Sequence, residues 1–152
     1  LQERWGRNGK RFKAFKFRTM VPDSDANFGI IPATAKDHRV TRIGRILRAM
    51  GLDELPQVLN ILRGDMSFVG PRPEREFFIK ELEKEIPYYK ERLTVKPGIT
   101  GWAQTCYRYG SSLDDAVEKL NYDLFYIKNM SLAMDLIIML KTAKTVILGK
   151  GI

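Results

Sequence analysis

The chain has 152 residues and a formal net charge of +8, from 26 lysine and arginine and 18 aspartate and glutamate residues. This length suits a single domain, residues 1–152, and the charge favours an anionic partner such as nucleic acid, a phosphorylated substrate or a lipid headgroup surface. Cys106 is the single cysteine and His38 the single histidine, which excludes a disulfide scaffold and a zinc site of the His/Cys kind. Any metal is therefore expected to have oxygen ligands, as Mg²⁺ and Mn²⁺ prefer.

The N-terminal segment LQERWGRNGKRFKAFKFRTM predicts a β-hairpin, because Asn8-Gly9 suits the left-handed angles of a tight turn. Apolar residues alternate with Lys13, Lys16 and Arg18 in its second arm, which predicts one basic face. Since Leu1 already lies within a predicted strand, we expect the chain to be a fragment with sequence missing upstream.

The next segments alternate between loop and helix. Residues 21–39 are polar and predict a loop, and the spacing of apolar residues from Ile43 to Met50 predicts an amphipathic helix that Gly51 can end. A second helix is predicted from Asp53 to Leu62. GDMSFVGPRP and VKPGITGW are expected to be turn regions on either side of a helix over 74–84.

Two further helices are predicted in the C-terminal part. A capping box at Ser112 precedes the first, and the second covers residues 131–148 and is unusually apolar. At 100° per residue its polar residues fall on one narrow face, while leucine, isoleucine, methionine and valine cover much of the rest. The pattern fits a core helix or an in-plane membrane helix. No run of 18 apolar residues occurs, so the chain as given is not expected to span a bilayer.

Asp53 and Glu54 are adjacent carboxylates at a predicted helix start, where acidic residues commonly complement the helix dipole. Their neighbours suggest chemistry instead, because an arginine-bearing helix precedes them and Pro71-Arg72-Pro73 follows. A carboxylate that attacks phosphorus needs cations to neutralise the phosphate oxygens. Adjacent side chains point in different directions, so one can attack while the other binds a metal.

Three segments, FKAFKFRTM, TRIGRILRAMGLDELPQVLNILRGDMSFVGPRP and VKPGITGWAQ, resemble the bacterial sugar transferase family, the monotopic phosphoglycosyl transferases. YRYGSS and YDLFYIKNMSLAMDLIIMLKT are similar to the catalytic domains of its large members. The resemblance implies transfer of a sugar 1-phosphate from a UDP-sugar to polyprenyl phosphate, such as undecaprenyl phosphate, with release of UMP. It implies a covalent phosphosugar on Asp53, with Glu54 as the Mg²⁺ ligand.

The resemblance also assigns further residues to the phosphates. Arg72 matches a family residue at the nucleotide diphosphate, and its planar fork suits phosphate oxygens. Lys16, Arg48 and Arg108 match basic residues near the phosphates, although single surface cations are more often solvated. Asp123 matches an acidic family residue that would support the substrate or metal site; the alternative is an exposed helix position.

Two features depart from the family pattern. Gly51 replaces the serine or threonine that commonly precedes Leu-Asp-Glu, so the pair of carboxylates is expected to be held by backbone alone. The family's N-terminal re-entrant membrane helix is not in this sequence. A site that meets a lipid-linked phosphate must lie at headgroup depth, which favours the membrane interface over the core for the apolar C-terminal helix.

The expected protein is thus a mostly helical α+β domain with a small N-terminal β-hairpin and amphipathic membrane-interface helices. It is expected to transfer phosphosugars at the cytoplasmic face of a bacterial inner membrane, in exopolysaccharide or glycoconjugate synthesis. The alternatives are a non-catalytic basic module that binds acidic membrane or nucleic acid, or a silent scaffold. No nucleic-acid recognition motif is present, and the sequence leaves open the identity of the sugar and whether the protein forms homo-oligomers.

Overall fold

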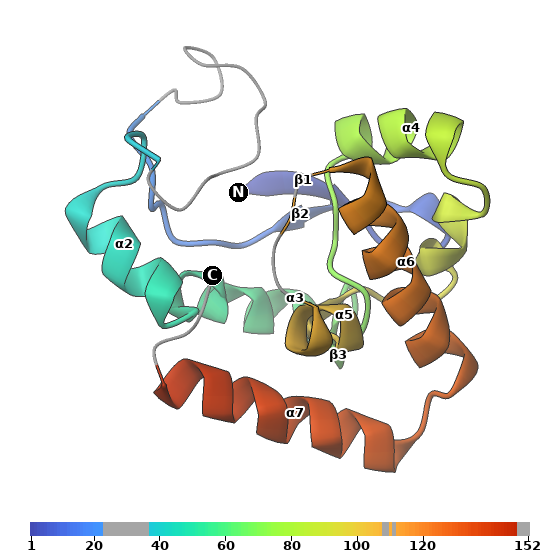
Figure 1. Ribbon diagram of the computed structural model, residues 1–152. Coiled ribbons are helices and arrows are strands. Elements are labelled where there is room, and N and C mark those ends of the chain that lie inside the picture. The colour runs from blue at the N-terminus through green and yellow to red at the C-terminus, as the bar shows by residue number, and fades with distance from the viewer. Residues whose placement is uncertain (23–36, 108–109, 111, 149–152) are drawn as a thin grey trace.

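The computed structural model describes residues 1–22, 37–107, 110 and 112–148. Helices surround two small two-stranded sheets, so the predicted mostly helical α+β class is confirmed (Figure 1). With η for a 3₁₀ helix, the elements in order are β1 (Gln2–Trp5), η1 (Arg7–Gly9), β2 (Arg11–Ala14), α2 (Arg42–Ala49), η2 (Leu52–Gln57), α3 (Val58–Leu62), β3 (Ser67–Val69), α4 (Glu76–Glu85), η3 (Tyr89–Leu93), β4 (Gly98–Thr100), α5 (Trp102–Cys106), α6 (Leu113–Lys128) and α7 (Leu132–Ile147).

The predicted N-terminal hairpin is confirmed. β1 and β2 pair antiparallel, and Asn8 and Gly9 in the turn have φ angles of 56° and 73°. Ala14 is buried near Met66, but the strand ends there, and Lys16 does not join Lys13 on an exposed basic face. The buried Asn60 side chain explains why β2 ends at Ala14. Its Oδ1 accepts a hydrogen bond from the amide of Phe15, the residue after Ala14, at 2.9 Å. Lys16 is thereby turned inward.

The two segments predicted as turns contain short strands instead. β3 pairs with β4 in parallel, with Ser67 opposite Gly98 and Val69 opposite Thr100, and α4 and η3 form the crossover between them. A three-residue strand is too short to show the alternation of apolar and polar residues that predicts a strand, and the surrounding glycines and prolines predict turns. Their pairing places GPRP beside KPGITG.

Three glycines let these two segments approach closely. A Cβ on Gly98 would lie 2.2 Å from the Gly70 nitrogen, and a Cβ on Gly101 would lie 2.3 Å from the Gly70 oxygen. The Gly98 amide donates to the Pro71 carbonyl at 3.0 Å, and the Gly70 amide donates to the Thr100 carbonyl at 2.9 Å. The backbone before and at Pro71 is therefore fixed from both sides, which sets the position of Arg72.

The helix predicted from Asp53 to Leu62 is divided into η2 and α3. Pro56 lies inside η2 and cannot donate an amide hydrogen bond, which favours the tighter 3₁₀ turn there. Gly51 ends α2 with φ of 65°, a left-handed conformation that a serine or threonine adopts only with strain. The expected glycine stop is confirmed, and the Ser112 capping box before α6 is also present.

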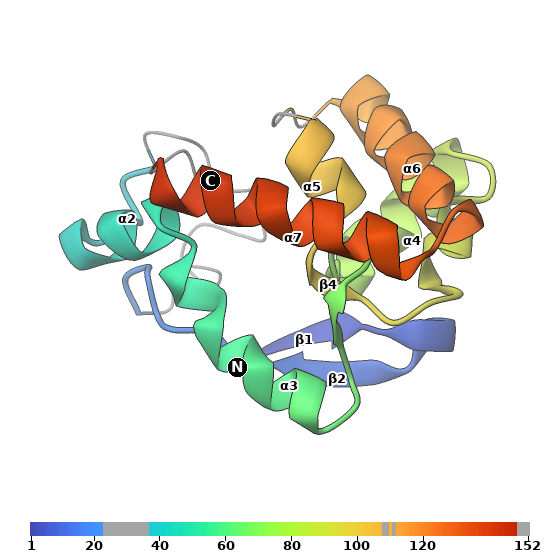
Figure 2. The ribbon, with the colours of Figure 1, turned by 90° about the horizontal axis from the view of Figure 1, so that it is seen from below.

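Helix α7 packs with its polar side inward. Asp135 accepts a hydrogen bond from the Tyr126 hydroxyl at 2.8 Å, and the Thr142 and Thr100 hydroxyls lie 2.6 Å apart, while Ile138 is fully buried. The opposite side, which we call the apolar face of α7, is exposed; it consists of Leu132, Leu136, Ile137, Leu140 and Ile147. Figure 2 shows α7 running across the underside of the molecule toward α2. Among the described helices, none has the length and apolar character needed to cross a membrane.

Candidate active site

The paired carboxylates are the second and third residues of η2, which follows Gly51. Asp53 is 3% exposed, and its carbonyl accepts the Phe17 amide at 2.9 Å, so the main chain after β2 lies against η2. Gly51 provides no side-chain cap, and its carbonyl accepts from the Glu54 amide at 3.4 Å. These backbone contacts position the pair, but it is not held by backbone alone as expected from Gly51, because the side chains of Lys16 and Arg72 also contact the carboxylates.

Lys16 joins the two carboxylates. Its Nζ lies 2.9 Å from Asp53 Oδ2 and 3.1 Å from Glu54 Oε1. The burial of Asn60, which redirects the chain at Phe15, explains why this lysine reaches the site while Lys13 stays in solvent. The lysine predicted near the phosphates thus lies against both carboxylates.

Arg72 contacts Glu54 from the other side. Its Nη1 donates to Glu54 Oε2 at 3.0 Å and its Nη2 donates to Oε1 at 2.5 Å, a bidentate pair. The two residues are 18 positions apart and meet because the β3–β4 pairing places the Pro-Arg-Pro turn over η2. The sequence prediction puts Arg72 at the nucleotide diphosphate; its guanidinium lies beside the carboxylates here, and the phosphate contact stays a prediction.

The charge state of Glu54 follows from these contacts. Burial alone raises the pKa of the Glu54 carboxyl, but Arg72 and then Lys16 outweigh it and lower the pKa from 4.5 to about 2. Glu54 is therefore a carboxylate throughout the physiological range. Because the Glu54 side chain is mostly buried, its negative charge depends on the nearby cations Arg72 and Lys16.

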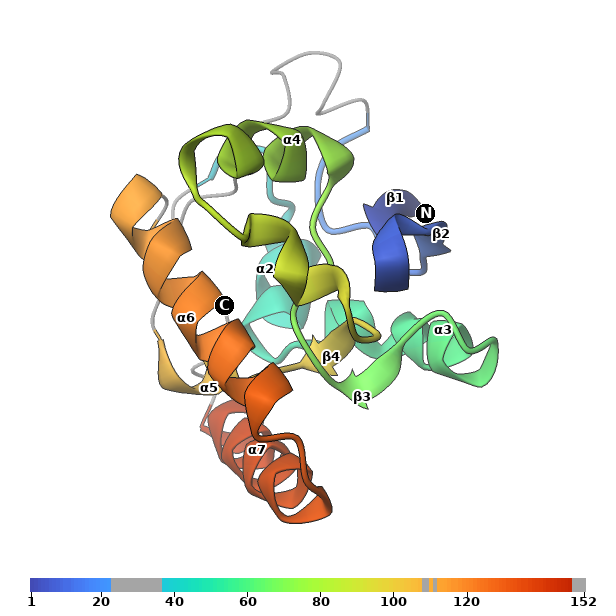
Figure 3. The ribbon, with the colours of Figure 1, turned by 90° about the vertical axis from the view of Figure 1, so that its right-hand side faces the viewer.

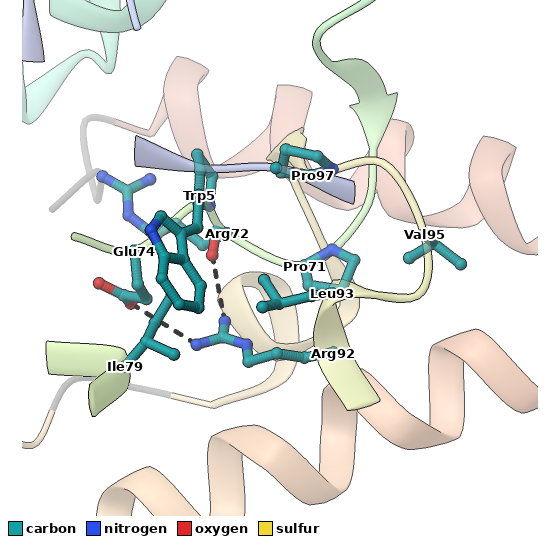
Figure 4. A pocket seen from close by; sticks show the side chains of 11 residues that line it. Trp5, Pro71, Arg72, Glu74, Ile79, Arg92, Leu93, Val95 and Pro97 are labelled. Atoms are coloured by element: carbon teal, nitrogen blue, oxygen red, sulfur yellow. Dashed lines mark hydrogen bonds and ion pairs between the residues drawn. The ribbon is translucent and has the colours of Figure 1, made fainter. Parts of the chain in front are cut away.

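A second layer of charge fixes the backbone of Arg72. Arg92 Nη2 donates to the Arg72 carbonyl at 3.1 Å, and Arg92 Nη1 lies 4.0 Å from Glu74 (Figure 4). Asp123, which is 2% exposed, lies 2.8 Å from Arg92. Burial raises the pKa of Asp123, an effect that Arg92 opposes. The alternative that Asp123 is an exposed helix residue is wrong. Asp123 contacts Arg92, which in turn binds the Arg72 carbonyl, so Asp123 supports the site through Arg92 and does not line it.

The other two predicted cations are placed differently. Arg48 donates from Nε to the Thr19 hydroxyl at 2.8 Å, which ties α2 to the chain after the hairpin rather than to the carboxylates. Arg108 lies outside the described residues. Sequence reasoning missed Arg92, because a lone arginine in a mixed-charge segment gives no signal of burial.

The described residues offer Mg²⁺ a pair of carboxylates but not a complete set of protein ligands. Within the described ranges no group of three His, Cys, Asp or Glu side chains comes together, so a cage made only of protein ligands is not present there. Mg²⁺ is commonly bound by one or two carboxylates together with substrate phosphates and waters, and Asp53 and Glu54 fit that pattern. Both Glu54 oxygens contact cations here, so a metal ion would share Glu54 with Arg72 and Lys16 or displace them.

Cations from separate segments that converge on two adjacent carboxylates can neutralise phosphate oxygens, as phosphoryl transfer requires. The chain belongs to the bacterial sugar transferase family, whose model matches residues 1–149.

Named relatives agree with this assignment. The chain is 44% identical over 151 residues to a UDP-N-acetylgalactosamine-undecaprenyl-phosphate N-acetylgalactosaminephosphotransferase of Aeromonas hydrophila, covering 99% of this chain and 36% of that protein. It is 45% identical over 148 residues to a UDP-glucose:undecaprenyl-phosphate glucose-1-phosphate transferase of Xanthomonas campestris, covering 96% and 31%. A galactosyl transferase of Streptococcus agalactiae is 39% identical over 160 residues, covering 99% and 34%. The chain thus spans about a third of the length of these relatives.

The lowered pKa of Glu54 predicts a pH-dependent contribution to stability. A carboxyl whose pKa falls on folding stabilises the protein above its unfolded pKa, here 4.5, and loses that contribution as the pH falls toward about 2. Glu54→Gln should therefore lower the urea midpoint at pH 7, and the gap to the unmodified protein should narrow between pH 4.5 and 2. A gap that stays constant over this range would contradict the ion-pair description. Glu118→Gln, an exposed change on α6, is the control.

Proposed function

We propose that this chain is the catalytic part of an enzyme that transfers a sugar 1-phosphate from a UDP-sugar to polyprenyl phosphate, such as undecaprenyl phosphate, and releases UMP. The observation that carries the proposal is the convergence of Lys16 and Arg72 on Asp53 and Glu54. The names of the relatives support the substrate classes. Those names include N-acetylgalactosamine, glucose and galactosyl transfer, so the proposal concerns UDP-sugars as a class.

In the proposed first step, an oxygen of the Asp53 carboxylate attacks the sugar-bearing phosphorus of the UDP-sugar. A bond forms between that oxygen and phosphorus, the bond to the bridging oxygen breaks, and UMP leaves with the electron pair. Arg72 and Lys16 would neutralise charge on the phosphate oxygens as they shift from Glu54 and Asp53 toward the substrate. The fixed backbone of Arg72 supplies the rigidity that such a contact requires.

In the second step, a phosphate oxygen of the lipid attacks the same phosphorus and displaces Asp53, which restores the carboxylate and yields a lipid diphosphate sugar. One carboxylate thus serves as nucleophile and then as leaving group. Division of the reaction into two displacements lets the nucleotide depart before the lipid phosphate enters, so both substrates can use the same small site.

We propose that Glu54 binds Mg²⁺ while Asp53 acts as the nucleophile. The bound ion would neutralise charge on the phosphate oxygens. Glu54 suits the role because it remains ionised while buried, and its cationic partners are available to exchange to phosphate.

We also propose that the protein lies at an anionic membrane interface, on the cytoplasmic face of a bacterial inner membrane. The support from the structure concerns the interface and comes from α7. The apolar face of α7 is exposed, with Leu140 at 72% and Ile147 at 83%, and Lys141 and Lys144 are exposed on the same helix. A contiguous apolar face flanked by lysines is the pattern of helices that lie in the headgroup region. The C-terminal end of α7 lies beside Gly51, two residues before Asp53, because a Cβ at Gly51 would be 3.9 Å from Val146. Binding of this face to lipid would therefore set the depth of the site.

The non-catalytic alternatives have less support. A basic module that binds nucleic acid would keep its cations in solvent, whereas Lys16 and Arg72 are directed at two carboxylates. A silent scaffold would not require Glu54 to stay charged while mostly buried, since burial of a charge is unfavourable without a compensating role.

Asp53→Asn should abolish both the covalent phosphosugar adduct and UMP release in the full-length protein, because the amide is not a nucleophile. Mass spectrometry of the intact protein detects the adduct, and a panel of UDP-sugars with undecaprenyl phosphate measures UMP. Asp114→Asn, an exposed first-turn acid of α6, is the matched control and should retain full activity. An Asp53→Asn variant with the unmodified rate would overturn the nucleophile assignment.

Glu54→Gln should raise the Mg²⁺ concentration required for half-maximal UMP release by about tenfold or more, since loss of even outer partners of a metal site costs roughly 10- to 100-fold in affinity. Titration of Mg²⁺ after treatment with a chelator gives this value. Glu118→Gln should leave it unchanged. Identical titrations for Glu54→Gln and the unmodified protein would count against a metal-binding role.

The membrane proposal predicts the depth of α7. In a background without other reactive cysteines, a fluorophore at Leu140→Cys in protein reconstituted into phosphatidylglycerol-containing vesicles should be quenched by brominated lipid and shielded from iodide. A fluorophore at Phe77→Cys should show the reverse, because α4 lies on the opposite side of the molecule from α7 (Figures 1 and 3). Equal iodide quenching at both positions would contradict the proposal.

A further inference from the structure

Beside the carboxylates lies a shallow hollow, open to solvent, that contains polar groups unused by the proposed steps. The residues around it come from β1, the end of the hairpin, η2 and the Pro-Arg-Pro turn; the polar ones are Gln2, Arg4, Lys16, Glu54, Gln57 and Arg72. Three of these six side chains are cations, which suits an anionic part of a larger ligand, such as a phosphate group.

Arg4 enters this hollow because of the hairpin register. Gln2 and Arg4 stand two residues apart on β1, opposite Ala14 and Phe12 of β2, so their side chains share one face with Ala14. The same face leads to Lys16, beyond the end of β2. Figure 2 shows the two strands beside α3, which continues from η2. The hairpin thus brings a second cation, Arg4, to the side of the site that Lys16 occupies.

The charge of Arg4 has little compensation. Within the part of the chain that the structure describes, its guanidinium makes one hydrogen bond, from Nη2 to Gln2 Oε1 at 2.8 Å, and no ion pair with a carboxylate. Burial lowers the pKa of Arg4 to about 10; Glu74 opposes the effect, and the nearby cations Arg75 and Arg72 add to it. Arginine still remains charged at neutral pH. A half-buried cation of this kind would be stabilised by an anion.

Gln57 places a second polar side chain at this hollow. It is 5% exposed as a residue and lines the hollow, and its amide atoms are not among the fully buried unpaired atoms of the described residues. The amide therefore borders the open space, where its NH₂ group can donate to an oxygen-rich ligand. Arg4 and Gln57 therefore offer donors to the same space from opposite sides, the hairpin and η2.

We propose that Arg4 is a further phosphate-binding residue of this enzyme, acting with Gln57 on phosphate oxygens that Arg72 and Lys16 do not neutralise. The inference rests on the proposed function. Two sources share this chemistry: the diphosphate of the UDP-sugar and the phosphate of the lipid acceptor. The two negative charges of Asp53 and Glu54 are balanced by the two positive charges of Lys16 and Arg72. These four groups together therefore leave no net positive charge for an incoming phosphate. Arg4 gives the site its surplus of positive charge.

The test compares Arg4→Gln with Lys13→Gln in the full-length protein. The control removes one charge from the same hairpin, but from its exposed face, and should leave binding and catalysis unchanged. Arg4→Gln should weaken binding of UDP, measured by calorimetry, by about 10- to 100-fold if Arg4 contacts the nucleotide diphosphate. If Arg4 contacts the lipid phosphate, UDP affinity should hold and transfer of the preformed adduct to undecaprenyl phosphate should slow by a similar factor.

Arg4→Gln behaving like Lys13→Gln in UDP affinity, adduct formation and adduct transfer would overturn the inference. Arg4→Lys keeps the charge but loses the planar fork, so it extends the test if Arg4→Gln does not fold; the affected step should then be weakened severalfold. A folded Arg4→Lys variant with all three properties unchanged would also overturn the inference if Arg4→Gln does not fold. By contrast, unmodified protein that releases no UMP from any UDP-sugar would overturn the proposed function itself.

Discussion

The bidentate pair between Arg72 and Glu54 is the interaction around which the rest of the site is arranged. The hairpin contributes Lys16 to it, η2 contributes the carboxylates, and the β3–β4 pairing brings in Arg72. Behind it, Asp123 and Arg92 hold the Arg72 carbonyl. Removal of two charges from water offsets most of the attraction of a buried pair, so stability alone does not explain this arrangement. The arrangement fits the proposed exchange of Lys16 and Arg72 from the carboxylates to a phosphate.

A second constraint is the exposure of apolar side chains on α7 and α2. α7 turns Asp135 and Thr142 toward Tyr126 and Thr100 and leaves leucine and isoleucine exposed, the reverse of the usual amphipathic surface helix. α2 shows a related feature, because Ile43 and Ile46 are exposed beside Arg42 and Arg45. Since α7 ends next to Gly51, a single lipid-facing surface would place the carboxylates at the depth where a lipid phosphate lies.

Several features were predictable because they depend on neighbours in sequence. Asn8-Gly9 marked the hairpin, Ser112 marked the start of α6, and Gly51 marked the end of α2. The short parallel strands were missed, because their pairing depends on glycines 28 and 31 residues apart from Gly70 that permit close approach. Lys16 was predicted to be near the phosphates, but its inward direction depends on Asn60, 44 residues away along the chain.

The sequence by itself determined the chemical groups: the adjacent carboxylates, the proline-flanked arginine, the excess of positive charge and the apolar C-terminal helix. It also determined the family, because those groups occur in a fixed order. Only the tertiary structure decided which cations meet the carboxylates, and it selected Lys16 and Arg72 while directing Arg48 to Thr19. It also brought Arg4 and Gln57 to the same hollow and placed Asp123 behind Arg92. The physical reason is that local pattern fixes helices and turns, whereas charge pairing and burial depend on contacts between distant segments.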